Sequence, residues 1–179
     1  RLPACPREYI ARLSSEDGGA LLDVKTLEDA SEKVALVDHS KYKYLISLDG
    51  QTCSSRFEKL LGLNSAVLKQ DSPYYGFYYR ALRAYEQYLP FWVNGQKDIL
   101  GVIQWATEND EVVERIAAAG RKFASAHLRR HGRLCYWKEL LTAYSKLMRY
   151  EASLEAYPNA VKLSEEPQMH SVKPRQGYT

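Results

Sequence analysis

Residues 41–57, KYKYLISLDGQTCSSRF, decide the fold of this chain. Their first part, residues 42–48, is a short run of apolar and aromatic side chains, which is typical of a buried strand. Asp49 and Gly50 then favour a turn that ends the strand. This half of the stretch therefore predicts a strand followed by a tight loop.

The second half of the stretch predicts the start of a helix. Hydroxyl groups that can cap a helix N-terminus come from Thr52, Ser54 and Ser55. Backbone N–H groups at such a terminus, together with the cation of Arg56, form a natural site for a phosphate. The alternative is that Arg56 only pairs with Glu58 or another carboxylate at the surface.

Two more strands are expected after this unit. Residues 65–69 predict a second buried strand, and residues 88–93 predict a short third one. Pro90 has no N–H to donate, so the third strand is expected away from the centre of the sheet. Residues 74–87, between these two strands, predict a turn and a Tyr-rich helix.

Helices are expected at both ends of the chain. Early ones are predicted from Pro6 and at residues 29–36. Asp98 is expected to cap a helix. The next helix is expected to start at Asn109 and Asp110 and to stop at His131-Gly132, and a last helix is expected at residues 135–150. Gly120 lies in the helix that starts at Asn109, and it makes that helix less stable by about 1 kcal/mol than alanine would, so close packing is expected there.

The alternation of strands and helices predicts an α/β fold with a parallel sheet covered by helices on both faces. Ligands bind such sheets at the carboxyl ends of the strands, near the point where the strand order reverses. The loops at residues 49–56 and 70–75 both follow strands, so we expect them to meet at one edge.

Composition indicates one ordinary domain. The chain has 179 residues, 45% hydrophobic and 26% charged, with a formal net charge of +3, which does not argue for a nucleic-acid partner. No apolar run approaches the roughly 20 residues needed to span a bilayer. We expect a domain at residues 1–157 and a polar, extended or disordered tail at residues 158–179.

Three cysteines, Cys5, Cys53 and Cys135, leave at least one without a partner in the chain. Their spacing contains no C-x-x-C and suggests no metal site. We expect each of them to be a small buried apolar side chain.

Four blocks carry a resemblance to a known family: KYKYLISLDG at residues 41–50, SSRF at 54–57, VLKQDSPYYGFYY at 67–79 and YLPFW at 88–92. In order and spacing they resemble the C-terminal half of the protein O-glucosyltransferases, the Rumi-like enzymes related to fungal capsule-associated proteins. The resemblance covers roughly residues 36–149.

The resemblance implies a Rossmann-like domain, equivalent to the C-terminal domain of a GT-B glycosyltransferase, that binds the nucleotide sugar. The positions that would line the nucleotide diphosphate are Gln51, Thr52, Cys53, Ser54, Ser55 and Arg56. The family's catalytic base lies in the N-terminal domain, so no catalytic residue is assigned here. The resemblance also implies a UDP-sugar donor, carrying glucose or xylose, and a hydroxyl acceptor on a protein or glycan.

The resemblance implies that no metal is needed, since members of the family lack the metal-binding DxD motif of other transferases, and no DxD motif occurs in this sequence. The implied location is the lumen of the endoplasmic reticulum or Golgi. The last residues, RQGYT, contain no receptor-read retention tetrapeptide of the endoplasmic reticulum.

A second interpretation is a catalytically inactive structural or interaction subunit of a larger assembly. A single domain facing an empty cleft would expose a Tyr-rich surface that a second domain or partner protein would cover.

Side chains that could contact the base or sugar have commoner uses in turn capping and packing. They are Asp71, Tyr74, Tyr75, Tyr78 and Tyr79.

Overall fold

A computed structural model describes most of the chain, at residues 5–16, 21–24, 34–50, 52, 54–150, 153, 155–157 and 159. The helix expected at residues 29–36 lies largely outside these residues, as does nearly all of the expected tail. The chain forms two compact units, Arg1–Cys135 and Tyr136–Thr179, and each is described by itself.

The first unit contains a parallel sheet. Its three strands are β1 (Tyr44–Ser47), β2 (Ala66–Gln70) and β3 (Leu89–Phe91), in the order β1-β2-β3. Both pairings are parallel, so the expected α/β fold is confirmed. The order of these described strands does not reverse, so they do not contain the reversal of strand order near which ligands are expected to bind.

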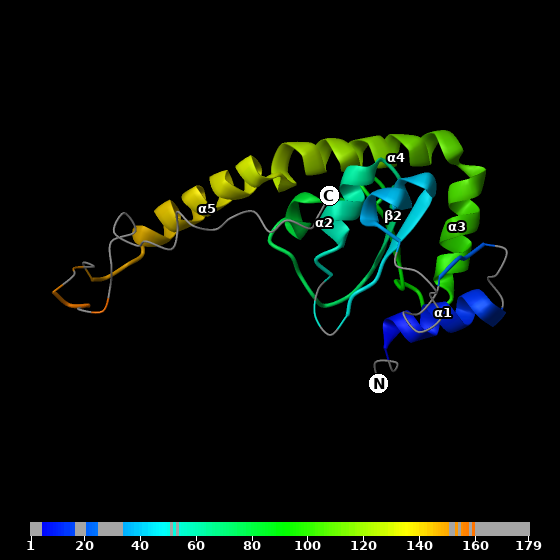
Figure 1. The fold of residues 1–179 in the computed structure, drawn as a ribbon, viewed down its shortest axis with the longest axis horizontal. Helices are drawn as coiled ribbons and strands as arrows, with labels where there is room; N and C mark the ends of the chain where they lie inside the picture. The colour runs from blue at the N-terminus through cyan, green and yellow to red at the C-terminus, as the bar shows by residue number, and fades with distance from the viewer. Residues whose placement is uncertain are drawn as a thin grey trace. The chain divides into compact units, whose positions relative to one another are not determined.

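Helices and helical turns lie before, between and after the strands (Figure 1). The α-helices are α1 (Pro6–Glu16), α2 (Phe57–Leu60), α3 (Asp98–Glu108), α4 (Asp110–Phe123) and α5 (Arg130–Ser145). Three 3-10 turns are η1 (Leu36–Lys41), η2 (Leu61–Leu63) and η3 (Tyr79–Ala81), and η4 (Ala124–Leu128) is a π-helix.

The central strand β2 is buried on both faces because successive side chains point in opposite directions. Ala66 and Leu68 join one apolar core with residues of α1, α3 and α4. Val67 joins the other core with Phe57 and Leu60 of α2. Figure 1 shows α3 and α2 on opposite sides of the sheet, which is the layered arrangement the sequence predicts.

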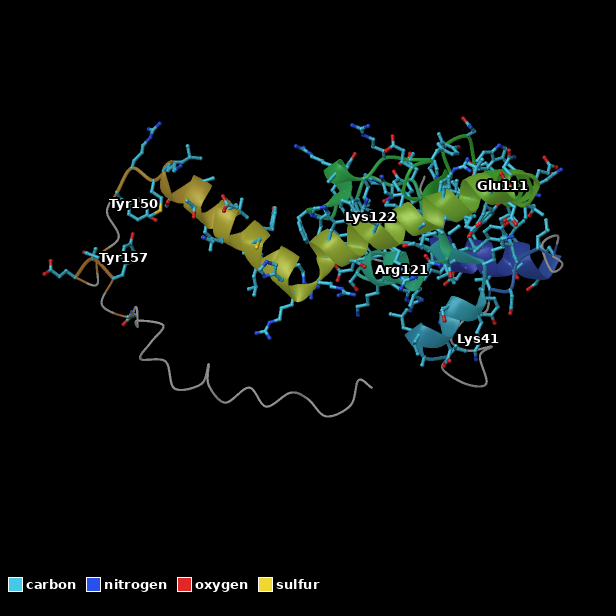
Figure 2. The ribbon with its side chains drawn as sticks, turned by 90° about the horizontal axis from the view of Figure 1, so that it is seen from above. Lys41, Glu111, Arg121, Lys122, Tyr150 and Tyr157 are labelled. Atoms are coloured by element: carbon cyan, nitrogen blue, oxygen red, sulfur yellow. The ribbon has the colours of Figure 1, made fainter. Side chains whose placement is uncertain are left out.

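Helix α4 carries charges that favour its macrodipole (Figure 2). Asp110 and Glu111 occupy its first turn, and Arg121 and Lys122 occupy its last. Acidic groups near a helix N-terminus and basic groups near its C-terminus each stabilise it by about 0.3–1 kcal/mol. Lys43, just before β1, also pairs with Asp110, with 2.5 Å between Nζ and Oδ1.

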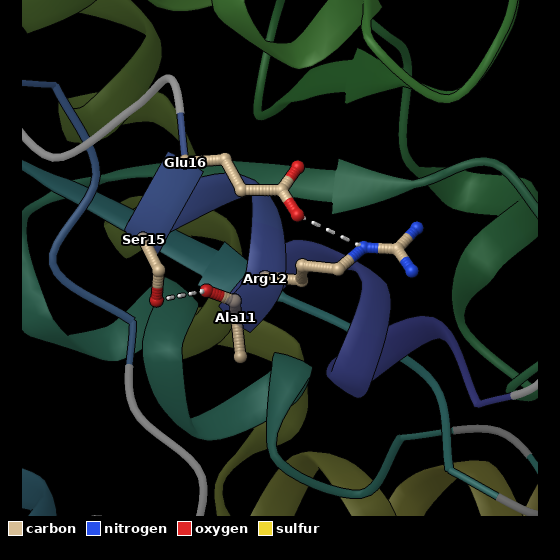
Figure 3. Close-up of polar contacts among 4 residues, drawn as sticks. All are labelled: Ala11, Arg12, Ser15 and Glu16. Atoms are coloured by element: carbon tan, nitrogen blue, oxygen red, sulfur yellow. Dashed lines mark hydrogen bonds and ion pairs between the residues drawn. The ribbon is translucent and has the colours of Figure 1, made fainter.

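Helix α1 begins at Pro6, as the sequence predicts, because proline is pre-organised for the first helical position. Its outer face is polar: Arg12 Nε lies 3.7 Å from Glu16 Oε1, and the Ser15 hydroxyl donates to the Ala11 carbonyl at 3.2 Å (Figure 3). Its inner face packs Ile10 in the core of the sheet.

Two local predictions are wrong. Asp98 does not cap α3, since the N-cap is Lys97. The Asp98 carboxylate instead accepts backbone N–H groups of the loop before it, from Trp92, Val93 and Asn94 at 2.6, 2.9 and 3.0 Å.

The expected Tyr-rich helix is only the 3-10 turn η3. Tyr78 and Tyr79 pack their rings on Phe57, at 6.2 and 5.6 Å between centroids, and this packing replaces a longer helix.

The expected stop at His131-Gly132 is also wrong. The chain stays helical through η4, breaks at Arg129, where the backbone is extended, and resumes as α5. Gly132 lies within α5, and a Cβ there would clash with the His127 carbonyl oxygen. Glycine therefore permits the close approach of backbone across this break.

The cysteines differ from expectation as well. Cys5 and Cys135 are free and exposed, so neither is a buried apolar side chain, and Cys53 lies outside the described residues. Their exposure follows from their positions, since Cys5 precedes α1 and Cys135 lies on a helix whose described residues are exposed or half-buried. In the part of the chain that the structure describes, no helix is long and apolar enough to cross a membrane.

Candidate functional site

The loops after β1 and β2 meet at the carboxyl edge of the sheet, as predicted. The Asp49 N–H donates to the Gln70 side-chain oxygen at 3.0 Å, and the Ser72 hydroxyl donates to Asp49 Oδ2. Asp71 in turn donates its N–H to the Phe91 carbonyl at 2.8 Å, which ties the second loop to the end of β3. The ends of all three strands are thus connected.

The Asp49 carboxylate organises this edge, a role that the sequence reading missed. The residue is only 5% exposed, and its Oδ1 accepts the Ser54 N–H at 2.7 Å while its Oδ2 accepts the Ser72 hydroxyl. Both loops are therefore held by one buried carboxylate. An aspartate beside a glycine looks like a turn residue in sequence, so the pattern gave no signal of this contact.

The candidate diphosphate loop has a defined geometry in its described part. Gly50 donates its N–H to the Thr52 carbonyl at 3.1 Å, and the Ser54 hydroxyl accepts the Arg56 N–H at 3.3 Å. Ser54 is buried, whereas Thr52, Ser55 and Arg56 are exposed. The other two candidate positions, Gln51 and Cys53, lie outside the described residues.

Helix α2 is shorter than the sequence suggests. It has four residues, its N-cap is Arg56, and no side chain caps it. The predicted hydroxyl caps are therefore wrong, since Ser54 instead bonds the Arg56 N–H before the helix begins. A single turn aligns few peptide dipoles, so side-chain cations and loop amides contribute more here than the helix dipole does.

Arg56 is exposed and makes no ion pair with any carboxylate that the structure describes. Its suggested partner Glu58 pairs instead with Arg133, at 3.3 Å between Oε1 and Nη1. The alternative pairing of Arg56 with Glu58 is therefore not observed.

A second guanidinium lies at the same loop. A Cβ built on Gly50 would come 3.3 Å from Arg7 Nη2, so α1 places this side chain against the loop backbone. Arg7 and Gly50 are far apart in sequence, and no motif in the chain indicates their contact.

Aromatic side chains surround the second loop in two groups. Tyr78 is buried and Tyr79 half-buried against Phe57, which is the packing role. Tyr74 and Tyr75 are 39% and 73% exposed, so their faces stay accessible beside the loop. The turn here is bonded by Ser72, whose Oγ accepts the Tyr74 N–H at 3.3 Å, rather than by Asp71.

Two titratable groups near this edge have altered pKa values. Burial lowers the pKa of Lys69, and the carboxylates of Asp49 and Asp71 partly oppose that effect. Burial also raises the pKa of Tyr88, with smaller contributions from Asp71 and Tyr75. Among the described residues, no group of three or more His, Cys, Asp or Glu side chains could hold a metal ion.

The sequence matches a family model over residues 6–175, and that model describes glycosyl transferase family 90. The chain belongs to this family. The match includes the whole sheet and both loops at its carboxyl edge.

Curated relatives include several O-glucosyltransferases. Protein O-glucosyltransferase 2 of Danio rerio is 40% identical over 114 residues, which are 64% of this chain and 23% of the relative. Protein O-glucosyltransferase 1 of Rattus norvegicus is 34% identical over 124 residues, 69% of this chain and 31% of the relative. The O-glucosyltransferase rumi homolog of Aedes aegypti is 34% identical over 122 residues, which are 68% of this chain and 30% of the relative. The chain thus spans less than a third of the length of these relatives.

Proposed function

We propose that this chain is the donor-binding part of a glycosyltransferase that moves glucose or xylose from a UDP-sugar to a hydroxyl of a protein or glycan. The observation that carries the proposal is the edge of the sheet where Asp49 holds two loops together and leaves Arg56 exposed without an ion pair to a described carboxylate. Family membership and the names of the relatives support the reaction class.

In the proposed mechanism the diphosphate binds at the loop of residues 51–56. Negative charge grows on the diphosphate as its bond to the sugar breaks, and the Arg56 guanidinium and loop amides stabilise that charge. Arg7, which lies against Gly50, adds a second cation beside the same loop. A carboxylate from a second domain, as in a GT-B arrangement, removes the proton of the acceptor hydroxyl.

The proposed donor site needs no metal, since two guanidinium groups supply the positive charge. The proposed location is the lumen of the endoplasmic reticulum or Golgi, on the basis of the resemblance to the protein O-glucosyltransferases. The donor site itself occupies residues of the first unit only.

One observation favours the alternative, an inactive interaction subunit. Apolar side chains along α5 are exposed, including Trp137, Leu141 and Tyr144 at 55%, 59% and 62%. An interaction subunit would use such side chains to bind a second domain or partner protein that covers them.

UDP binding tests the donor site. We expect calorimetry to show micromolar binding of UDP by the chain, and Arg56→Ala to weaken it about tenfold, because a hydrogen bond to a charged group contributes about 1.5 kcal/mol or more.

The control for this test is Arg115→Ala, which removes an exposed arginine from α4, where no candidate residue lies. It should leave UDP affinity unchanged. A folded chain that does not bind UDP would contradict the donor-site proposal and favour the interaction subunit.

A further inference from the structure

Lys69 brings an ammonium group to the carboxyl edge of the sheet. Its Nζ lies 4.7 Å from the centre of the Tyr79 ring and 5.8 Å from that of Phe57, and it donates to the Gln70 carbonyl at 2.9 Å. Phe57 directly follows Arg56 in the chain. The ammonium group is therefore beside the start of α2, next to the candidate diphosphate loop.

Two carboxylates act on this ammonium group, one from each loop. Asp49 comes from the end of β1 and Asp71 from the end of β2, and both interact electrostatically with Lys69. Asp49 is buried, and its two oxygens already accept hydrogen bonds from Ser54 and Ser72. Without a nearby cation, these two negative charges would repel a diphosphate at the same edge.

The surroundings of Lys69 hold its charge in one place. Aromatic faces attract a cation, and the half-buried position restricts the side chain more than a surface lysine would be restricted. Burial lowers the pKa of Lys69 despite the two carboxylates, so its environment is drier than that of the exposed Arg56. A charge in such surroundings acts on its neighbours more strongly than one in water.

We propose that Lys69 is a positioning residue of the donor site, whose ammonium group offsets the charge of Asp49 and Asp71 so that a nucleoside diphosphate can bind beside Arg56. This inference rests on the proposed function. Lys69 acts through the local charge and need not touch the ligand. A purely structural lysine would contribute only its packing against Tyr79 and Phe57.

The test compares UDP binding by the full chain and by two variants, Lys69→Met and Lys69→Arg. Lys69→Met keeps an apolar side chain of similar length, and we expect it to weaken UDP binding about tenfold. Lys69→Arg keeps the charge and the contact with the aromatic rings, so its affinity should stay close to that of the unaltered chain.

The pH dependence separates charge from packing. As pH rises from about 7 to about 9.5, the unaltered chain should lose affinity, because the lowered pKa of Lys69 brings loss of its proton toward this range. Lys69→Arg stays charged and should not show this loss. Tyr88 stays neutral because its pKa is raised, and titration of UDP itself affects both proteins equally.

The outcomes are distinct. Equal UDP affinity in the unaltered chain and a folded Lys69→Met overturns the role of Lys69 and leaves the donor site standing. The same pH profile in the unaltered chain and Lys69→Arg also overturns it. If Lys69→Met does not fold, this pH comparison alone tests the role of Lys69. Failure of the folded, unaltered chain to bind UDP overturns both proposals.

Discussion

Replacing Asp49 with alanine is expected to lower the free energy of unfolding by about 3 kcal/mol, the combined effect of losing hydrogen bonds to a buried charged acceptor. The carboxylate accepts the Ser54 N–H and the Ser72 hydroxyl, and the residue is 5% exposed. Alanine would leave the buried Ser54 N–H without this acceptor. Both loops at the carboxyl edge would lose their shared contact, so UDP affinity should fall as well.

Denaturation in urea, followed by tryptophan fluorescence, measures this change. Asp71→Ala is the matched control, because it removes an exposed carboxylate from the same edge and should change stability by no more than about 0.5 kcal/mol. Asp49→Asn should fall between the two, since its amide keeps one acceptor oxygen but presents a donor to the second partner. Equal stabilities of the two alanine variants would show that Asp49 does not hold the loops together.

The sheet could be predicted because its pattern is local. The β1 stretch is a short apolar run between turn residues, and β2 is apolar on both faces, as a central parallel strand must be. Pro90 indicated a strand away from the centre, and among the described strands β3 is paired on one side only. Each of these features depends on residues within a few positions of one another.

The helical turns between the strands could not be predicted in the same way. Residues 74–87 are expected to include a Tyr-rich helix, but Tyr78 and Tyr79 pack on Phe57, which belongs to α2. That tertiary contact outweighs local helix preference. Asp98 shows the same limit, because its position favours a cap but its carboxylate accepts N–H groups of the preceding loop.

Half of the candidate site was visible in the sequence. Arg56 and the loop hydroxyls stand out because they follow a strand and precede apolar residues. Arg7 lies against Gly50 only because α1 packs beside the sheet, and Lys69 looks like an ordinary lysine at the end of a strand. Such contacts between distant segments leave no spacing for a single sequence to reveal.

Gly120→Ala in α4 is expected to lower the free energy of unfolding by about 2 kcal/mol, although alanine favours a helix over glycine by about 1 kcal/mol. A Cβ at Gly120 would lie 2.7 Å from the Gln87 carbonyl oxygen and 3.1 Å from Leu61 Cδ2. The Leu61 side chain can rotate away, but the Gln87 carbonyl belongs to the backbone just before β3. Close packing, which the sequence predicts for this glycine, thus has an observed cause.

Gly101→Ala in α3 is the matched control, because Gly101 is exposed and a Cβ there would meet nothing within 4 Å. Helix propensity alone acts at this position, so the variant should gain about 0.5–1 kcal/mol. The two substitutions are chemically identical and both lie inside helices, so opposite signs in urea denaturation would isolate the contact between α4 and Gln87. Stabilisation by both would mean that this backbone yields at little cost, and that α4 does not need glycine to pack against the sheet.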